Sequence, residues 1–377
     1  MATAARQVSR SGAAAIRVLL VDDSAVIRGM LRRWLEESSA IEVVGAAQNG
    51  QVAIHEARQL QPDIIILDIE MPVMDGLTAL PKLKEAVDGC HVIMASTLTK
   101  RNADISLRAM RLGATDYIPK PESRLEMTSG SDFKSAITEK VIALGTARRK
   151  RLGLAVPAVQ KNVASEQDTS TKVAPRPRPR RAAASLPDII AIGSSTGGPQ
   201  ALFTVLEKLK PSCTLPVVIT QHMPATFTSI LAGHLEKISG RPCTEGEEGM
   251  PIKAGHIYVA PGGKHMLVSG TPANPSLVLD EGPEENFCRP AVDPLFRSVA
   301  DVYGARSLGV ILTGMGTDGL KGCGVLRDQG ARILVQDEAT STVWGMPGAV
   351  SKAGLADDVL PIAGMADAIM RCARSTN

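Results

Sequence analysis

The feature that most constrains this chain is a repeated alternation of short apolar runs with stretches of helical spacing. Each run is five to seven residues long and rich in Ile, Val and Leu, as in DIIILD and SLGVILT. Strands that are apolar along their whole length are buried on both faces, and the helical stretches between them allow parallel crossover connections. The pattern therefore predicts an α/β protein with doubly wound parallel sheets.

The runs form two series. In the first, strands are expected at 16–21, 41–46, 63–68, 91–96 and 114–119, with helices at 24–37, 50–59, 75–86, 101–112 and 131–145. In the second, strands are expected at 188–193, 215–220, 256–261, 276–280, 307–313 and 331–336, with a small hairpin around 256–280 and helices at 198–209, 224–238, 293–303, 318–329 and 364–373. Two α/β domains are thus predicted.

A basic segment rich in Pro, Ala and Arg separates the two series. Residues 148–181 carry a net charge of +8, which leaves −5 for the rest of the chain. Alternating Pro and Arg favour extended polyproline II, so the segment is expected to be a semi-rigid tether, with contact to an acidic partner as the alternative. The predicted organisation is a disordered leader (1–15), a first domain (16–147), a linker (148–186) and a second domain (187–377).

Composition excludes several classes of protein. No apolar run approaches the roughly 20 residues that a membrane span needs, and no cleavage site follows the N-terminal arginines. The six cysteines are scattered without a CxxC pair, which excludes zinc ribbons and a disulfide framework and favours free thiols in the cytoplasm. Aromatic residues make up 3% of the chain, too few for a base-stacking surface that binds nucleic acid.

Polar side chains follow four strands of the first domain. Asp22 and Asp23 end the first strand, Asp68 ends the third, and Ser96 and Lys120 follow the fourth and fifth. Because the carboxyl ends of parallel strands meet at one edge of a sheet, these groups should converge there. Clustered carboxylates suit Mg²⁺, and with a lysine and a hydroxyl they suit phosphoryl transfer. Taken singly, each of these residues is equally compatible with a helix cap or a turn.

In this order (DD, D, S and KP), the motifs make residues 16–145 resemble the receiver domain of two-component response regulators, which has a flavodoxin-like fold. The resemblance implies that Asp68 accepts a phosphoryl group from a histidine kinase. It also implies that Mg²⁺ is held by Asp23, Asp68 and the backbone carbonyl of Glu70, with Asp22 acting through water.

The same resemblance assigns roles around the phosphoryl group. Lys120 and Ser96 would contact the phosphate, with Ser96 as the switch hydroxyl. Tyr117 stands where receivers carry an aromatic switch residue, and the Lys120–Pro121 peptide bond would be cis.

The second domain begins with a strand that leads into a glycine-rich turn. Residues 193–197 (GSSTG) fit G-x-S-x-G, which lifts the hydroxyl of Ser195 to the top of a sheet and aims the Thr196 N–H at an oxyanion. On its own the turn is equally compatible with a phosphate loop or with tight packing. No Walker lysine follows it, and Ser195 interrupts a G-x-G-x-x-G pattern.

A histidine and an aspartate follow two further strands. His222 comes just after one strand and Asp318 lies in a glycine-rich loop after another. If they converge with Ser195, His222 can accept the serine proton while Asp318 orients the imidazole. The alternatives are a structural histidine and a helix-capping aspartate. Ser194 competes with Ser195, but the motif places the nucleophile at Ser195.

The segments AIGSSTGGP, QHMP, HIYVAPGGKH and LTGMGTDG make residues 187–373 resemble the catalytic domain of the chemotaxis protein-glutamate methylesterases, with a Rossmann-like fold. The resemblance implies Ser195 as nucleophile, His222 as general base and acid, and Asp318 as its partner. Thr196 would serve the oxyanion hole and Met315 would lie beside the site. Ser194 stands where alanine is common.

The resemblance implies hydrolysis of γ-glutamyl methyl esters on methyl-accepting chemotaxis receptors, with release of methanol. Some receptor glutamines would also be deamidated, and neither reaction needs a metal or cofactor. Phosphorylation by the chemotaxis histidine kinase would activate the esterase by removing the first domain from the cleft. The enzyme would work in the cytoplasm, without inserting into the membrane or binding nucleic acid.

Two other classes remain open at this point. A receiver joined to a DNA-binding output would make a transcriptional regulator, but the second half has no helix-turn-helix signal. A dinucleotide-dependent oxidoreductase would explain the glycines after 188–193, but no acidic residue follows about 20 positions later to meet a ribose.

Overall fold

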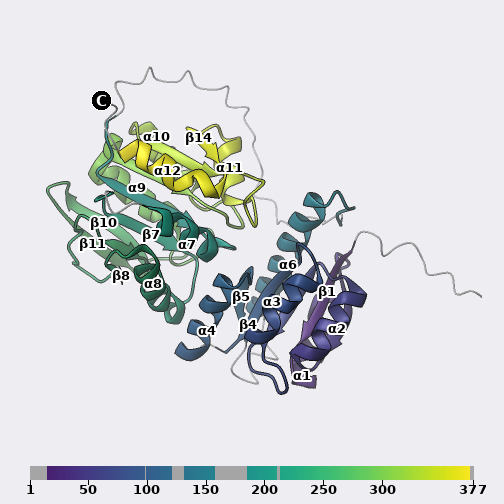
Figure 1. The fold of residues 1–377 in the computed structure, drawn as a ribbon. Helices are drawn as coiled ribbons and strands as arrows, with labels where there is room; N and C mark the ends of the chain where they lie inside the picture. The colour runs from purple at the N-terminus through teal and green to yellow at the C-terminus, as the bar shows by residue number, and fades with distance from the viewer. Residues whose placement is uncertain (1–14, 98, 121–130, 158–184, 210–212, 374–377) are drawn as a thin grey trace, which may run out of the picture. The chain divides into compact units, whose positions relative to one another are not determined.

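A five-stranded parallel sheet forms the first of the two units into which the chain divides (Figure 1). The computed structural model describes residues 15–97, 99–120, 131–157, 185–209 and 213–373. The strand order is β2-β1-β3-β4-β5, made of β1 (Ile16–Val21), β2 (Ile41–Ala47), β3 (Ile64–Asp68), β4 (His91–Ser96) and β5 (Asp116–Pro119). All five lie where the sequence predicts them, and the order changes direction between β1 and β3, where a doubly wound sheet opens a site.

The helices of this region follow their strands as expected. They are α1 (Ala25–Leu35), α2 (Gly50–Leu60), α3 (Gly76–Ala86) and α6 (Ser131–Arg151). Helix α4 (Lys100–Arg111) follows β4 in the chain but belongs to the second unit. The side chains of Ser24, Asn49 and Asp75 cap α1, α2 and α3 by accepting backbone N–H bonds. Helix α1 packs against α6 and α2 against α3, which gives two helical layers around the sheet.

Helix α6 is longer than the predicted helix 131–145 and reaches four residues into the segment predicted as linker. Arg148 and Arg149 are buried, and both guanidinium groups contact the carboxylate of Asp63, at 2.5 Å and 2.9 Å. This buried ion pair makes the start of the basic segment part of the folded unit. Residues 158–184 of the predicted linker, and residues 1–14 of the leader, lie outside the described residues.

A seven-stranded parallel sheet forms the second unit, in the order β14-β13-β12-β6-β7-β9-β8. Its strands are β6 (Ile189–Ser194), β7 (Val217–Gln221), β8 (Cys243–Glu245), β9 (Ile257–Val259), β12 (Ser307–Ile311), β13 (Arg332–Gln336) and β14 (Asp358–Leu360). The order changes direction between β6 and β12. The three-residue strands β8 and β14 were not predicted, because they are too short to carry a pattern.

The hairpin predicted around 256–280 begins later than expected. Residues 257–259 form β9 of the main sheet, and the antiparallel hairpin consists of β10 (His265–Thr271) and β11 (Asn274–Asp280). Of the two strands expected there, only 276–280 belongs to the hairpin.

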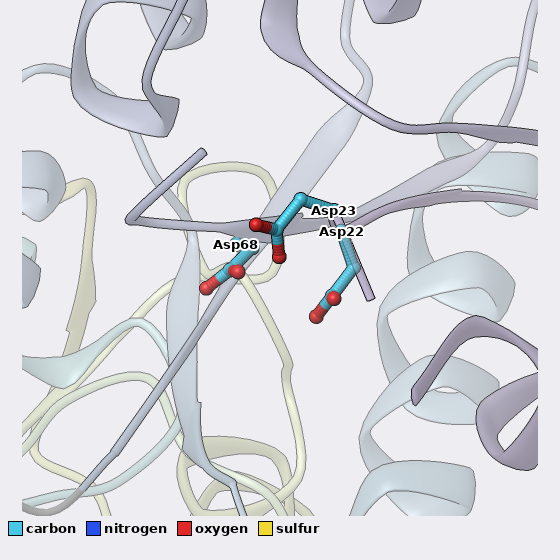
Figure 2. Close-up of side chains that lie close together, drawn as sticks. All are labelled: Asp22, Asp23 and Asp68. Atoms are coloured by element: carbon cyan, nitrogen blue, oxygen red, sulfur yellow. The ribbon is translucent and has the colours of Figure 1, made fainter. Parts of the chain in front are cut away.

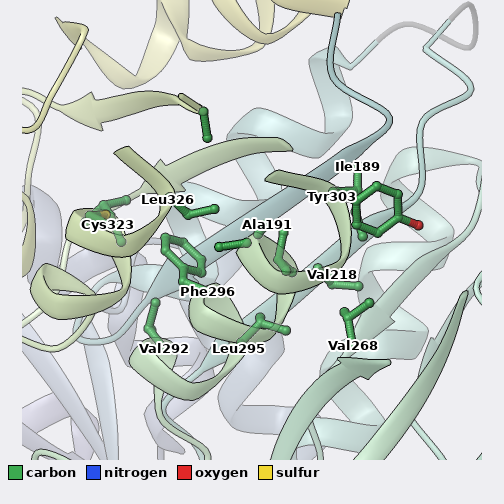
Figure 3. Close-up of a cluster of buried hydrophobic side chains, with 14 of the residues drawn as sticks. Ile189, Ala191, Val218, Val268, Val292, Leu295, Phe296, Tyr303, Cys323 and Leu326 are labelled. Carbon is green, nitrogen blue, oxygen red and sulfur yellow. The ribbon is translucent and has the colours of Figure 1, made fainter. Parts of the chain in front are cut away.

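Helices cover the large sheet in two groups. They are α7 (Gly198–Lys208), α8 (Ala225–Ser239), α9 (Val292–Tyr303), α10 (Leu320–Asp328), α11 (Met346–Lys352) and α12 (Ile362–Ala373). Helix α7 packs against α8 and α12, whereas α9 packs against α10 and the hairpin strand β10. Figure 3 shows α9 directing Leu295 and Phe296 into a core with Ala191 and Val218 of the sheet. Complete burial of such side chains stabilises the fold by roughly 1.5–3 kcal/mol each.

The helices that the structure describes include none with the length and apolar character needed to cross a membrane.

Candidate functional site

The turn after β6 has the strand–turn–helix form predicted from GSSTG. Strand β6 ends at Ser194, Ser195 follows half-buried, and α7 starts at Gly198. Gly197 has a φ of 76°, and a Cβ built on it would lie 2.4 Å from the side-chain oxygen of Thr342. Only glycine fits this conformation and this space, so the turn that exposes the serine depends on it.

Two backbone N–H groups follow Ser195 at the start of α7. Thr196 is buried, and its carbonyl accepts the hydroxyl of Thr313 at 2.9 Å. In the described part of the chain the backbone N–H groups of Thr196 and Gly197 donate to no acceptor. Because they lie at the N-terminus of α7, the helix dipole adds to their attraction for a negative oxygen.

Gln221, which the sequence reasoning missed, joins the loops that carry Ser195 and His222. The hydroxyl of Ser194 donates to Oε1 of Gln221 at 2.7 Å. In turn, Nε2 of Gln221 donates to the carbonyls of Ser195 and His222, at 3.0 Å and 3.3 Å. Ser194 and Gln221 are register partners in adjacent strands. The sequence signal that could have identified this contact is a polar residue at the end of each of two strands that can pair.

His222 and Asp318 meet as predicted. Nε2 of His222 lies 2.7 Å from Oδ2 of Asp318, which is 2% exposed. The carboxylate also accepts bonds from the side chain of Asn286 (2.9 Å) and from the backbone N–H groups of Val292 (2.6 Å), Asp293 (3.1 Å) and Gly319 (2.9 Å). The aspartate is therefore held rigidly in its ionised form.

The protonation of this pair follows from its surroundings. Burial lowers the pKa of His222, but the hydrogen bonds and charges of Asp318 and Cys288 outweigh it and raise that pKa to about 9. Burial raises the pKa of Asp318, but the contacts with His222 and with backbone N–H groups outweigh it. The pKa of Asp318 is therefore below its ordinary value. The pair is thus an imidazolium–carboxylate pair at neutral pH.

Ser195 lies beside His222 without a hydrogen bond to it. The backbone N–H of His222 donates to the carbonyl of Ser194 at 3.2 Å, so the two loops are adjacent. Nδ1 of His222 instead faces Sγ of Cys288 at 3.3 Å. In the described residues Ser195 Oγ has no hydrogen-bond partner. The structure thus brings His222 and Asp318 into contact, and backbone and Gln221 hydrogen bonds join the loop of Ser195 to the loop of His222.

Asn286 and Cys288 come from a turn that the sequence analysis did not single out. The turn spans Glu285–Cys288, and its ends are joined by two backbone hydrogen bonds of 3.0 Å and 3.2 Å. An asparagine and a cysteine in an irregular segment carry no periodic signal, so only the fold reveals them. Met315, predicted beside the site, is half-buried in the loop between Gly314 and Asp318.

The first unit carries the second predicted site. One carboxylate oxygen each from Asp22, Asp23 and Asp68 lies within 4.8 Å of the others. Figure 2 shows these three side chains close together. Asp22 and Asp68 are buried, and Asp23 is exposed. Three hard oxygen donors at the ends of β1 and β3 fit Mg²⁺ well.

Lys120 completes this cluster. Its Nζ lies 2.6 Å from Oδ2 of Asp22 and 2.7 Å from Oδ1 of Asp68, and its backbone N–H donates to the carbonyl of Ser96 at 2.7 Å. Burial raises the pKa of Asp68 and Lys120 lowers it, with a net rise. Ser96 is buried at the end of β4. The side chains of Asp22, Asp23, Asp68 and Lys120 therefore meet, beside the backbone carbonyl of Ser96.

Two further residues of the predicted receiver site, Tyr117 and Glu70, lie in the described part of the chain. Tyr117 is buried, with Nζ of Lys140 5.3 Å from the centre of its ring. Glu70 is exposed just after β3. The predicted cis bond involves Pro121, which lies outside the described residues.

Comparison with known families divides the chain in the same way. The model of the CheB methylesterase family matches residues 190–369, and that of the response regulator receiver domain matches residues 18–130. Among solved structures, the CheB methylesterase catalytic domain of Thermotoga maritima is 37% identical, with a TM-score of 0.48, covering 49% of this chain and 98% of that one. The response regulator domain of Thermotoga maritima CheB is 38% identical, with a TM-score of 0.31, covering 34% of this chain and 93% of that one.

Curated relatives match almost the whole chain. Protein-glutamate methylesterase/protein-glutamine glutaminase 1 of Rhodospirillum rubrum is 50% identical over 370 residues, covering 95% of each chain. The protein of the same name from Paramagnetospirillum magneticum is 51% identical over 366 residues, covering 95% of this chain and 96% of that one. This chain belongs to the CheB family of protein-glutamate methylesterases/protein-glutamine glutaminases, with a receiver domain before the catalytic domain.

Proposed function

We propose that this protein hydrolyses glutamate methyl esters on methyl-accepting chemotaxis receptors, releases methanol and deamidates receptor glutamines. The observation that carries the proposal is the 2.7 Å contact of His222 with Asp318, on a loop hydrogen-bonded to the strand–helix turn that carries Ser195. The names of the relatives, which state both activities, support it. The receptor helices that carry such glutamates lie in the cytoplasm, where the enzyme would act.

The reaction is an acyl transfer through Ser195. Its Oγ attacks the ester carbonyl and gives its proton to Nδ1 of His222, because Nε2 is already bound to Asp318. The N–H of Thr196 donates to the oxygen that becomes negative. When the tetrahedral intermediate collapses, the bond to the methoxy oxygen breaks and methanol leaves with the proton from Nδ1.

The second half of the cycle repeats these steps with water. His222 takes a proton from water as the oxygen attacks the acyl-serine, and the proton returns to Oγ of Ser195 when glutamate leaves. Deamidation follows the same path, with ammonia in place of methanol. Asp318 stays ionised throughout and stabilises the imidazolium.

The receiver domain regulates the esterase. A carboxylate oxygen of Asp68 attacks the phosphoryl group, and the bond from phosphorus to the histidine nitrogen of the kinase breaks, which leaves the kinase imidazole free. Lys120 and the Ser96 hydroxyl contact the phosphate. Asp23, Asp68 and the carbonyl of Glu70 would hold Mg²⁺, with Asp22 acting through water, and the ion when bound would neutralise charge on the phosphoryl oxygens. Phosphorylation then shifts the receiver away from an inhibitory state and raises the esterase rate.

The direct test is release of labelled methanol from receptors that carry radioactive methyl groups. The full chain should release methanol, faster with acetyl phosphate and Mg²⁺ than without. His222→Gln should release none above background. Intact chain that releases no methanol under either condition would overturn the proposal.

A further inference from the structure

The half-buried thiol of Cys288 faces the ring nitrogen of His222 that the proposed reaction needs. Nε2 of His222 is bound to Asp318, so Nδ1 is the nitrogen left for the proton of Ser195. Sγ of Cys288 lies 3.3 Å from that Nδ1. The thiol therefore occupies the place at which the serine proton must arrive.

The position of Cys288 is fixed by the turn that also holds Asp318. Asn286 and Phe287, at the centre of the turn, have left-handed φ values of 53° and 59°. The side chain of Asn286 donates to Oδ1 of Asp318 at 2.9 Å. Nonglycine residues persist in this conformation only where their surroundings hold them, so the sulfur is not free to drift from the imidazole.

We propose that Cys288 is a positioning residue of the esterase site: its sulfur shares a proton with Nδ1 of His222 in the resting enzyme and thereby sets how readily the imidazole becomes a free base. This inference rests on the function proposed above. Cys288 thereby takes a role in the site in addition to the serine, the histidine and the aspartate.

Whether Nδ1 of His222 carries a proton decides whether the imidazole can act as a base, and Cys288 influences this. When Nδ1 carries a proton, His222 is an imidazolium and cannot accept a proton from Ser195. When Nδ1 is unprotonated, His222 can act as the base. The contact with the sulfur of Cys288 raises the pKa of His222, so the sulfur keeps the base protonated up to a higher pH.

The other charges near this pair do not replace that effect. Burial lowers the pKa of His222, and the contacts with Asp318 and Cys288 together hold it near 9. The charges of Asp293 and of the paired Glu285 and Arg297 interact with Asp318, and none of the three is among the groups that shift the pKa of His222. Removing the sulfur therefore leaves Asp318 alone to stabilise the imidazolium.

The chain offers a matched control. All six cysteines lie in the described residues, where five are buried and Cys288 is half-buried. Cys372, on α12, is a buried thiol of the same unit that contacts neither His222 nor Asp318 in the described structure. A substitution there tests for the general effect of losing a thiol.

The test titrates His222 directly in the full-length protein. NMR of imidazole resonances, assigned with His222→Gln, should give a pKa in Cys288→Ala about one unit lower than in the intact chain. Cys288→Ser keeps a small hydrogen-bonding group in place of the sulfur, so its value should lie between the two. Cys372→Ala should match the intact chain. A shift of one unit would raise the fraction of free base at pH 7 about tenfold.

The pH dependence of methanol release should follow the same order. If the Ala variant does not fold, the Ser variant alone carries the comparison. Equal His222 titration in the intact chain and the folded variants would overturn the proposal. If substitution of Cys288 leaves the pKa of His222 unchanged while methanol is still released, the role of Cys288 is refuted. If the pKa of His222 falls as expected but the intact chain releases no methanol, the esterase function is refuted instead.

Discussion

Oδ2 of Asp318 lies 2.7 Å from Nε2 of His222, and five hydrogen bonds in all converge on that buried carboxylate. Three of the donors are backbone N–H groups around the starts of α9 and α10, so the acid is positioned by the fold rather than by flexible side chains. A carboxylate fixed in this way needs no reorganisation when the imidazole becomes charged. The central feature of the site is therefore a preorganised histidine–aspartate pair.

Replacing the acid should remove this stabilisation. In Asp318→Asn the negative charge is lost, so the imidazolium of His222 is less stable. The amide NH₂ also faces backbone N–H donors, and the tautomer of His222 with its proton on Nε2 is no longer favoured. The rate of methanol release should fall by about 10⁴-fold. Asp301→Asn, an exposed residue of α9, is the control and should keep its rate. A fall of less than tenfold in Asp318→Asn would contradict the assigned role.

The raised pKa of His222 predicts an alkaline optimum. The base must be neutral, so kcat/KM for ester hydrolysis should rise with pH and level off above about 9. A rate that levels off near 6.5, the ordinary pKa of histidine, would show that the pair does not act as described.

The same shift predicts how stability changes with pH. Because folding raises the pKa of His222 from 6.5 to about 9, its contribution is complete below pH 6.5 and disappears as the pH rises through 9. Urea unfolding of the intact chain and of His222→Gln should therefore differ more at pH 6 than at pH 10. A difference that grows with pH would contradict the sign of the shift.

Ser194 and Gln221 should be energetically coupled. Either single substitution to Ala leaves a buried polar group without its partner, at a cost of about 1–3 kcal/mol. The double variant removes both groups, so its loss of unfolding free energy should be smaller than the sum of the single losses, with a coupling of about 0.5–3 kcal/mol. Urea denaturation of all four proteins measures this. Additive losses would mean that the 2.7 Å contact does not stabilise the strand ends.

Asp68→Asn should abolish control by the receiver. Without the carboxylate no acyl phosphate can form, so the ratio of esterase rates with and without acetyl phosphate should fall to one. Incorporation of labelled phosphate should fall to background in parallel. Asp75→Asn, an exposed cap of α3, is the control. Chelation of divalent cations should reproduce the loss in the intact chain, and stimulation that survives both treatments would point to another phosphorylated residue.

Much of the fold followed from the sequence because its signals are local. Apolar runs as long as DIIILD allow only buried strands, and GSSTG requires a tight turn wherever it lies. The pairing of His222 with Asp318 also followed, since both residues come after strands that end at the same edge of one sheet. Here local pattern and global topology impose the same arrangement.

Other features depend on contacts that no local pattern carries. Arg148 and Arg149 have the composition of a linker, but the distant carboxylate of Asp63 and several backbone carbonyls hold their guanidinium groups in the folded unit. The contact of Cys288 with His222 likewise joins residues 66 positions apart through an irregular turn. Such features require the coordinates because their cause lies in tertiary structure.

The most direct test of the account compares two adjacent serines. Ser195→Ala and Ser194→Ala remove the same hydroxyl from neighbouring residues of one turn, but only Ser195 carries the proposed nucleophile. Methanol release from methylated receptor should fall to background in Ser195→Ala and keep more than about a tenth of its rate in Ser194→Ala, since the single lost hydrogen bond weakens positioning only. Full activity in a folded Ser195→Ala protein would contradict the central claim.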